Sequence, residues 1–179
     1  MADSAAVDTR PVLPPAAELS TLKARQLYWS AVEPIWKRVS IYDGAETFTR
    51  QFASVTEAQG LLLAAHWCQS EVCNGGLHQF FSNMTGVLAP EAVRGFRLIE
   101  VPAAGEIVAR AMTLLGQLYP RDQTKRRLRL GVIEKPGKSR SEWDPFYALD
   151  AEFYKVTGTS KFATQADAFV RNHLALFFR

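Results

Sequence analysis

Residues 71–83, Glu-Val-Cys-Asn-Gly-Gly-Leu-His-Gln-Phe-Phe-Ser-Asn, hold the densest group of side chains that could do chemistry in this chain. Cys73 and His78 are the residue types of a thiolate nucleophile and its general base. Such a pair is recognised by its geometry in space and by a third residue that orients the base, and not by close spacing in sequence. No third residue is apparent here, so the stretch does not predict nucleophilic catalysis, and we expect no catalytic residues.

A metal site is the second kind of chemistry to test. His66, Cys68, Cys73 and His78 are zinc-ligand types, but they form neither a Cys-x-x-Cys nor a His-Glu-x-x-His pattern. Cys68 lies in an apolar run and is typical of a small core residue. We therefore predict no metal and no cofactor.

Two further interpretations of the stretch stay open. Glu71 falls in the last turn of a predicted helix, where the helix dipole disfavours an anion, and the chain re-enters a helix at Leu77 with unpaired N–H groups. In the structural interpretation Glu71 accepts hydrogen bonds from those N–H groups at a tight corner. In the binding interpretation the stretch forms a surface or a pocket. The candidate residues for either role are Glu71, Asn74, Gly75, Gly76, His78, Gln79, Phe80, Phe81 and Asn83.

Helical periodicity of the apolar residues predicts the elements that position this stretch. The predicted helices cover residues 19–39 with a break near Pro34, 48–55, 59–74, 77–83, 90–100, 102–118, 144–156 and 164–178. A Thr56-x-x-Gln59 pattern is typical of a capping box that starts the apolar helix of residues 59–74, our candidate for the central buried element. No long run alternates with period two. The sequence thus predicts an all-α fold: one compact domain, residues 18–179, of about seven or eight helices.

The positive charge of the chain is concentrated in one segment. Eight basic residues oppose two acidic ones between Arg121 and Arg140, whereas the rest of the chain carries 13 basic and 16 acidic residues. Because Gly131, Pro136 and Gly137 interrupt it, residues 119–142 are predicted to be a basic excursion, with an irregular strand or turn at 127–133. Its candidate basic patch comprises Lys125, Arg126, Arg127, Arg129, Lys135, Lys138 and Arg140.

The remaining features concern location. Residues 1–17, rich in Ala and Pro, are predicted to be a disordered tail and lack the pattern of a secretory signal. No apolar run approaches the ~20 residues of a membrane span. Cys68 and Cys73 are too far apart around a helix to form a disulfide. These features predict a cytoplasmic protein without membrane contact.

Residues 71–83, followed by Ala89-Pro90-Glu91-Ala92, resemble the signature of the DNA-mimic-protein-like family, a bacterial domain family of unknown function. The resemblance covers about residues 19–116. In the family Asn is commoner at the position of Cys73 and an aromatic residue at that of Leu77, which counts against a shared cysteine mechanism. The resemblance implies an α-helical fold and no enzyme activity or cofactor. For the naming member, it implies sequestration of a DNA-binding regulator by an acidic surface that imitates phosphates.

Charge separates this chain from such a mimic. Recognition by DNA-binding proteins depends on phosphate-like charge, so a mimic needs rows of carboxylates. Here the net charge is +3. We therefore expect a non-enzymatic cytoplasmic protein-interaction module whose partner is a protein such as a transcriptional regulator. Nucleic-acid contact is expected to be weak and nonspecific at most, and a homodimer stays open. The alternative is a small enzyme or ligand-binding domain with a pocket around Glu71, His78 and Asn83.

Overall fold

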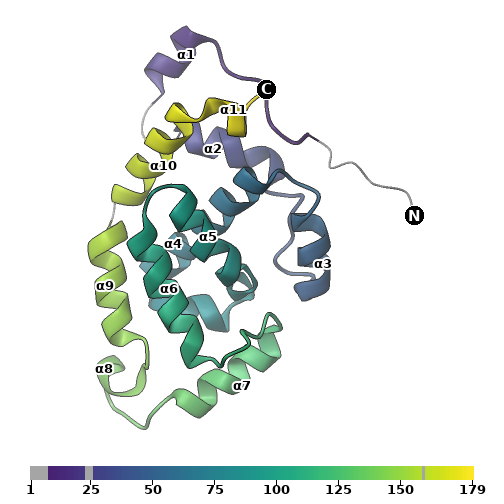
Figure 1. Ribbon diagram of the computed structural model, residues 1–179. Helices are drawn as coiled ribbons and strands as arrows, with labels where there is room; N and C mark the ends of the chain where they lie inside the picture. The colour runs from purple at the N-terminus through teal and green to yellow at the C-terminus, as the bar shows by residue number, and fades with distance from the viewer. Residues whose placement is uncertain (1–7, 23–25, 159) are drawn as a thin grey trace.

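The computed structural model describes residues 8–22, 26–158 and 160–179, and within them the chain is helical with no strand (Figure 1). Its α-helices are α1 (Ala16–Thr21), α2 (Gln26–Val32), α3 (Gly44–Phe52), α4 (Glu57–Ser82), α5 (Ala89–Leu98), α6 (Pro102–Leu114), α7 (Gln123–Ile133), α8 (Arg140–Trp143), α9 (Tyr147–Thr157), α10 (Lys161–Asn172) and α11 (Leu174–Phe177). Two 3₁₀ helices, η1 (Glu33–Ile35) and η2 (Met84–Leu88), join them. In this part of the chain eight α-helices have seven residues or more, so the predicted all-α class is confirmed.

Helix α4 is the centre of the core. It is 26 residues long, and residues 61–65 are buried all round rather than on one face. A helix that is apolar on every side must be surrounded by other helices. In Figure 1 the other helices lie around α4, with α5 and α6 in front of it. The prediction of a central buried helix from this apolar run is correct.

Close backbone contact joins α5 to α4. A Cβ atom at Gly95 of α5 would meet the carbonyl oxygen of Leu61 in α4, so only glycine permits the helices to approach this closely. Pro90 and Pro102 lie in the first turns of α5 and α6, where a missing N–H costs no intrahelical bond. Together α4, α5 and α6 form a layered unit against which the later helices pack.

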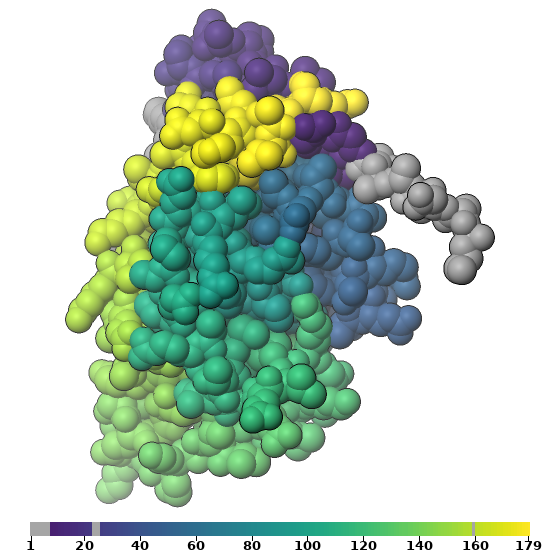
Figure 2. Space-filling model, viewed as in Figure 1, coloured from purple at the N-terminus to yellow at the C-terminus, as the bar shows by residue number. Residues whose placement is uncertain are grey.

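The remaining helices cover both ends of this unit. α10 lies against α2, where the Asp167 carboxylate accepts a hydrogen bond from the Tyr28 backbone N–H at 2.8 Å. α10 and α11 cover one end of the molecule, and α7 and α8 lie at the other (Figures 1 and 2). None of the described helices is both long and apolar enough to cross a bilayer.

The N-terminal segment contacts the C-terminus. The Leu13 N–H donates to the Arg179 carbonyl at 3.0 Å, and the Arg179 N–H donates to Pro11 at 2.9 Å. Thr9 is 7% exposed, and its hydroxyl donates to Gln59 at 2.6 Å. Within the predicted tail of residues 1–17, these contacts attach residues 9–13 to the domain, whereas residues 1–7 lie outside the described part.

The predicted capping box at Thr56 does not form. Thr56 occupies the N-cap position of α4 without a side-chain cap, and its hydroxyl donates to Gln59 instead. The Gln59 amide in turn donates to the backbone carbonyls of Thr9 and Ala31. Gln59 thus joins three distant segments, which is a tertiary role that the local pattern does not reveal.

Several predicted element boundaries need correction. The helix expected at 48–55 is α3, from Gly44 to Phe52, the helix expected at 102–118 ends at Leu114, and the helix expected at 164–178 is divided into α10 and α11. The expected helix 19–39 is divided: α1 ends at Thr21, α2 begins at Gln26, and Pro34 lies in η1. Residues 127–133, expected as an irregular strand or turn, belong to helix α7. The interior Gly131 costs a helix about 1 kcal/mol, but the capping of α7 by Asp122 and burial of one α7 face offset that cost.

Candidate functional site

Residues 71–83 surround a sharp change of direction in α4. At Gly76 the backbone has φ 84° and ψ 176°, a conformation that residues with a Cβ atom avoid. A Cβ atom there would also collide with the side chains of Arg140 and Asp150. Position 76 therefore needs glycine on conformational and steric grounds. The predicted break in the helix lies at this residue.

Asp150, from α9, completes the corner. Its carboxylate accepts a hydrogen bond from the Leu77 backbone N–H at 2.8 Å and from Arg140 Nη2 at 2.7 Å. Arg140 also donates to the Gly75 carbonyl at 3.0 Å and to Asp144 at 2.9 Å. Asp150 is 3% exposed, and this burial raises the pKa of its carboxyl above the usual value, although the bonds from Leu77 and Arg140 oppose the shift.

The structural interpretation therefore assigned the cap to the wrong carboxylate. Glu71 was expected to accept from the N–H groups at the corner, but the Leu77 N–H is bonded to Asp150. Asp150 is 73 residues away in sequence from Leu77. No local spacing or motif links the two residues, so sequence reasoning had no signal by which to find Asp150.

Glu71 has a different set of partners. Its Oε2 atom accepts from the Gln79 side-chain amide at 3.0 Å and from the Asn83 side-chain amide at 2.9 Å. Glu71 precedes the break at Gly76, whereas Gln79 and Asn83 follow it. The three side chains thus form a clamp that holds the two halves of α4 at a set angle. Three of the candidate binding residues are engaged with one another in this way.

The structure does not pair Cys73 with His78. His78 Nε2 lies 2.7 Å from a carboxylate oxygen of Glu134, and the edge of its ring faces Trp143 at 5.1 Å between centroids. Cys73 is exposed, and its sulfur accepts from Gln69 at 3.2 Å. Each residue contacts a different neighbour, so the arrangement provides no nucleophile and base pair.

The other motif residues divide between core and surface. Phe80 and Phe81 are wholly buried, and Phe81 packs against Phe146 at 5.3 Å between ring centroids. Asn74 is exposed. Among the described side chains every buried polar atom has a hydrogen-bond partner. Around Gly76 the stretch of residues 71–83 thus forms a sharp turn of the chain whose buried polar side-chain atoms are all hydrogen-bonded.

Part of the predicted basic patch is engaged within the fold, at the C-terminal end of α4. Arg126 is 0% exposed and donates to the carbonyls of Phe81 at 2.8 Å and Asn83 at 2.8 Å, at the C-terminal end of α4. Arg127 Nε donates to the neighbouring Ser82 carbonyl at 3.0 Å. The last carbonyls of a helix lack intrahelical partners and attract cations, which explains why these arginines bind there.

The patch must be corrected accordingly. Arg126 is buried, and burial lowers the pKa of its guanidinium. Arg140 is held by Asp144, Asp150 and Gly75. Four patch residues are exposed and do not bind the ends or the corner of α4: Lys125, Arg129, Lys135 and Lys138. The sequence alone could not separate the buried basic residues from the exposed ones, because both groups have the same charge and lie interspersed in one segment.

The start of the excursion is anchored too. Tyr119 donates its hydroxyl hydrogen to the Gly86 carbonyl at 2.7 Å. Arg121 makes two hydrogen bonds to the Glu91 carboxylate, at 2.9 and 2.6 Å. Burial raises the pKa of the Tyr119 hydroxyl well above its usual range. These contacts attach residues 119–121 to η2 and α5 and place α7 beside the end of α4.

The described residues contain no group of three or more His, Cys, Asp or Glu side chains arranged to hold a metal ion. Cys68, one of the four zinc-ligand types considered, is buried, and this burial raises the pKa of its thiol, which disfavours a metal-binding thiolate. Both cysteines are free, which agrees with the prediction that they do not form a disulfide.

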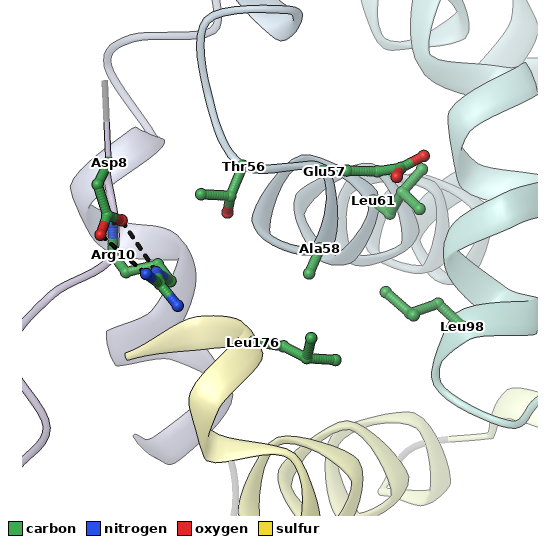
Figure 3. Close-up of a pocket in the computed structure, with 8 residues that line it drawn as sticks. All are labelled: Asp8, Arg10, Thr56, Glu57, Ala58, Leu61, Leu98 and Leu176. Atoms are coloured by element: carbon green, nitrogen blue, oxygen red, sulfur yellow. Dashed lines mark hydrogen bonds and ion pairs between the residues drawn. The ribbon is translucent and has the colours of Figure 1, made fainter. Parts of the chain in front are cut away.

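Hollows lie on the surface of the described residues, and one of them borders the signature stretch at Cys73. One, of about 490 Å³, is bordered by the Asp8–Arg10 ion pair and has Ala58, Leu61, Leu98 and Leu176 among its lining residues (Figure 3). A second, of about 530 Å³, includes Tyr28, His66, Cys73 and Tyr154 in its lining. Neither lining includes Glu71, His78 or Asn83, the residues of the predicted pocket.

The fold and the corner define a class of protein: an all-α domain with a kinked central helix, whose signature residues stabilise the kink. A family profile described as DMP19-like protein matches residues 53–173, which include the whole corner, Asp150 and α7. The chain belongs to this family. Comparison with curated proteins and with solved structures gives no significant match.

Proposed function

We propose that this chain is a non-enzymatic cytoplasmic protein-interaction module whose partner is another protein, in particular a DNA-binding regulator. One observation carries the proposal: the polar side chains of the signature stretch are engaged in holding the corner. Glu71 is bonded to Gln79 and Asn83, and His78 contacts Glu134. Side chains used in this way are not presented to a substrate, so the working surface lies elsewhere.

Family membership supports a partner that binds DNA, since the family is named after a DNA mimic. The surface charge argues for recognition other than phosphate mimicry. Three exposed carboxylates are paired with arginines on neighbouring helices: Glu57 with Arg94, Glu106 with Arg97 and Glu152 with Arg110. Carboxylates neutralised in this way do not form a free row of negative charge. The partner would therefore be bound through features of the protein surface other than a duplex-like acidic stripe.

The proposal can be tested by capture and reconstitution. The full chain is immobilised, native extract is passed over it, and a protein retained in stoichiometric amount is purified and measured against the chain by calorimetry. We expect a defined complex. If the partner is a DNA-binding regulator, we expect a mixed-sequence duplex to alter the measured affinity, because the duplex and this chain then share that partner.

The matched variant is His78→Gln, which replaces the imidazole that contacts Glu134 at the predicted pocket. It should leave the affinity for the partner within about twofold, since only coupled sites give larger changes. Native mass spectrometry of the purified chain tests the ligand-binding alternative. A small molecule bound to the wild type and absent from His78→Gln, with no protein partner retained, would support the ligand-binding alternative and contradict the proposal.

A further inference from the structure

Helix α7 has an outer face that combines positive charge with exposed apolar groups. Lys125, Leu128, Arg129 and Val132 occupy positions i, i+3, i+4 and i+7, which lie on one side of a helix. Leu128 is 68% exposed and Val132 is 77% exposed. These four residues are called the outer face of α7 below.

The opposite face of α7 is firmly attached to the domain. Arg126 is 0% exposed and Leu130 is 2% exposed, and Asp122 caps the helix by accepting from the Lys125 N–H at 2.9 Å. The exposed leucine and valine are therefore held on an ordered helix and do not result from fraying of the chain. A preformed helix face loses little conformational entropy when a partner binds.

A hollow lies at the C-terminal end of α7, which contributes Ile133 to its lining. It measures about 440 Å³, and its lining includes the apolar groups of Leu114, Ile133, Trp143, Pro145 and Tyr147 and the cation of Lys135. Two carboxylates also border it, but Glu142 accepts from the backbone N–H groups of Lys138 and Ser139, and Asp144 accepts from Arg140. Ile133 follows Val132 directly in sequence. Tyr147 is 50% exposed and Leu114 is 43% exposed. The hollow can accept an apolar side chain, and Lys135 supplies a cation beside it.

Building on the protein-interaction role above, we propose that the outer face of α7 and this hollow dock an acidic amphipathic segment of the partner protein. The apolar side of such a segment covers Leu128 and Val132 and inserts a side chain into the hollow. Its carboxylates face Lys125, Arg129 and Lys135. Charge complementarity of this kind sets orientation and association rate, and apolar burial supplies affinity.

The chemistry of the surface favours this occupant over a nucleic acid or a membrane. A sugar-phosphate backbone would satisfy the cations but leave Leu128 and Val132 in water, and the nearby aromatic rings, Trp143 and Tyr147, line the hollow and do not alternate with the cations of the outer face. A membrane-binding helix buries a full apolar face, whereas the inner face of α7 is occupied by the domain itself.

The direct test measures a labelled acidic amphipathic peptide of about four helical turns, with leucines on one side and glutamates on the other, by fluorescence anisotropy. A scrambled peptide of the same composition is the ligand control. A mixed-sequence duplex and phosphatidylserine-containing vesicles represent the other occupants. We expect the full chain to bind the amphipathic peptide in preference to all three, with affinity that falls as salt increases.

Two paired variants examine the two components of the surface. Leu128→Ser with Val132→Ser and, separately, Lys125→Glu with Arg129→Glu should each weaken peptide binding by about tenfold or more. The matched control is Lys37→Glu with Arg38→Glu, two exposed cations outside α7, which should change affinity by less than about twofold. Thermal unfolding of all variants should match the wild type, because the changed side chains are exposed.

The outcomes distinguish failure of the docking surface on α7 from failure of the proposed protein-interaction function. Peptide affinity that is unchanged in both α7 variants, absent from the wild type, or exceeded by that for the duplex or vesicles would overturn the docking surface. If the captured partner binds the α7 variants as tightly as the wild type, the interaction role stands and this surface is the wrong one. If the peptide binds as expected but no protein partner exists, the surface stands and the proposed function fails.

Discussion

The corner at Gly76 and the outer face of α7 are both rich in functional residue types, yet the fold uses them in opposite ways. At the corner Glu71, Gln79, Asn83 and Asp150 are bonded to neighbours within the chain. On α7, Leu128 and Val132 extend into solvent. The difference teaches that a dense cluster of polar residues can be a structural joint, whereas an inconspicuous pair of aliphatic residues can mark an interaction surface.

Replacing Gly76 with alanine should have the largest effect on stability. The backbone conformation at this position disfavours a Cβ atom, and that atom would displace Arg140 or Asp150, so we expect a loss of about 3 kcal/mol or more in the free energy of unfolding. Urea denaturation measures the loss. The comparison is Gly75→Ala, where the Cβ atom would displace the Gln79 side chain and its hydrogen bond to Glu71, so we expect a smaller loss than at position 76. An equal loss in both variants would show that the corner does not depend on position 76.

Removing the Asp150 carboxylate should cost more than removing that of Glu71. Asp150→Ala leaves the buried Leu77 N–H without its acceptor and removes one of the acceptors of Arg140, a loss of about 2–4 kcal/mol. Glu71 is partly exposed and its amide partners can turn toward water, so Glu71→Ala should cost about 0.5–1.5 kcal/mol. Thermal unfolding of the two variants side by side decides the order. A reversed order would restore the original assignment of the cap to Glu71.

Two arginines of the same helix should differ in their contribution to stability. Arg126→Met deprives the carbonyls of Phe81 and Asn83 of their donor and should cost about 2–3 kcal/mol. Arg129→Met changes an exposed residue and should shift the free energy of unfolding by less than about 0.5 kcal/mol. Chemical denaturation is the measurement. Similar values for the two variants would mean that α7 does not support the end of α4, and the contrast between its two faces would be lost.

The smallest expected effects concern pH, and they differ in sign between two carboxylates of α9. Burial raises the pKa of Asp150, so the folded state holds its proton more tightly than the unfolded state above the ordinary value of 3.8. Its contribution to stability is therefore fully present below that value and declines as pH rises through the raised pKa. The hydrogen bond from Arg110 lowers the pKa of Glu152, whose contribution is present above the ordinary value of 4.5 and is lost as pH falls.

Melting temperatures of the wild type, Asp150→Asn and Glu152→Gln between neutral and acidic pH test this pair. On acidification the wild type should gain stability relative to Asp150→Asn and should lose its advantage over Glu152→Gln. Parallel curves for all three proteins would contradict the assigned directions.

The apolar pattern of the chain was sufficient to predict its helical class and the central helix, and the glycines before Leu77 predicted the break. These features depend on local physics: the apolar residues of α4 require burial on every side, and Gly76 permits a conformation that other residues avoid. The sequence did not predict helix α7. The cost of Gly131 to a helix can be judged from the sequence. The burial of Arg126 and Leu130, which stabilises the helix despite that cost, depends on the folded domain.

The signature stretch was correctly located by sequence, but its bonding partners were decided by tertiary structure. Asp150, Arg140 and Arg126 reach the corner from segments distant in sequence, and no spacing rule connects them to Gly76 or Asn83. Likewise, Lys125 and Arg126 are adjacent and both basic, yet one is exposed and the other is wholly buried. The sequence by itself determined the helical class, the central helix and the position of the kink, because these follow from burial and backbone conformation along the chain. Only the packing of α7 and α9 against α4 decided which charges close the corner and which remain for a partner, because burial of a side chain depends on the face that its helix turns toward the core.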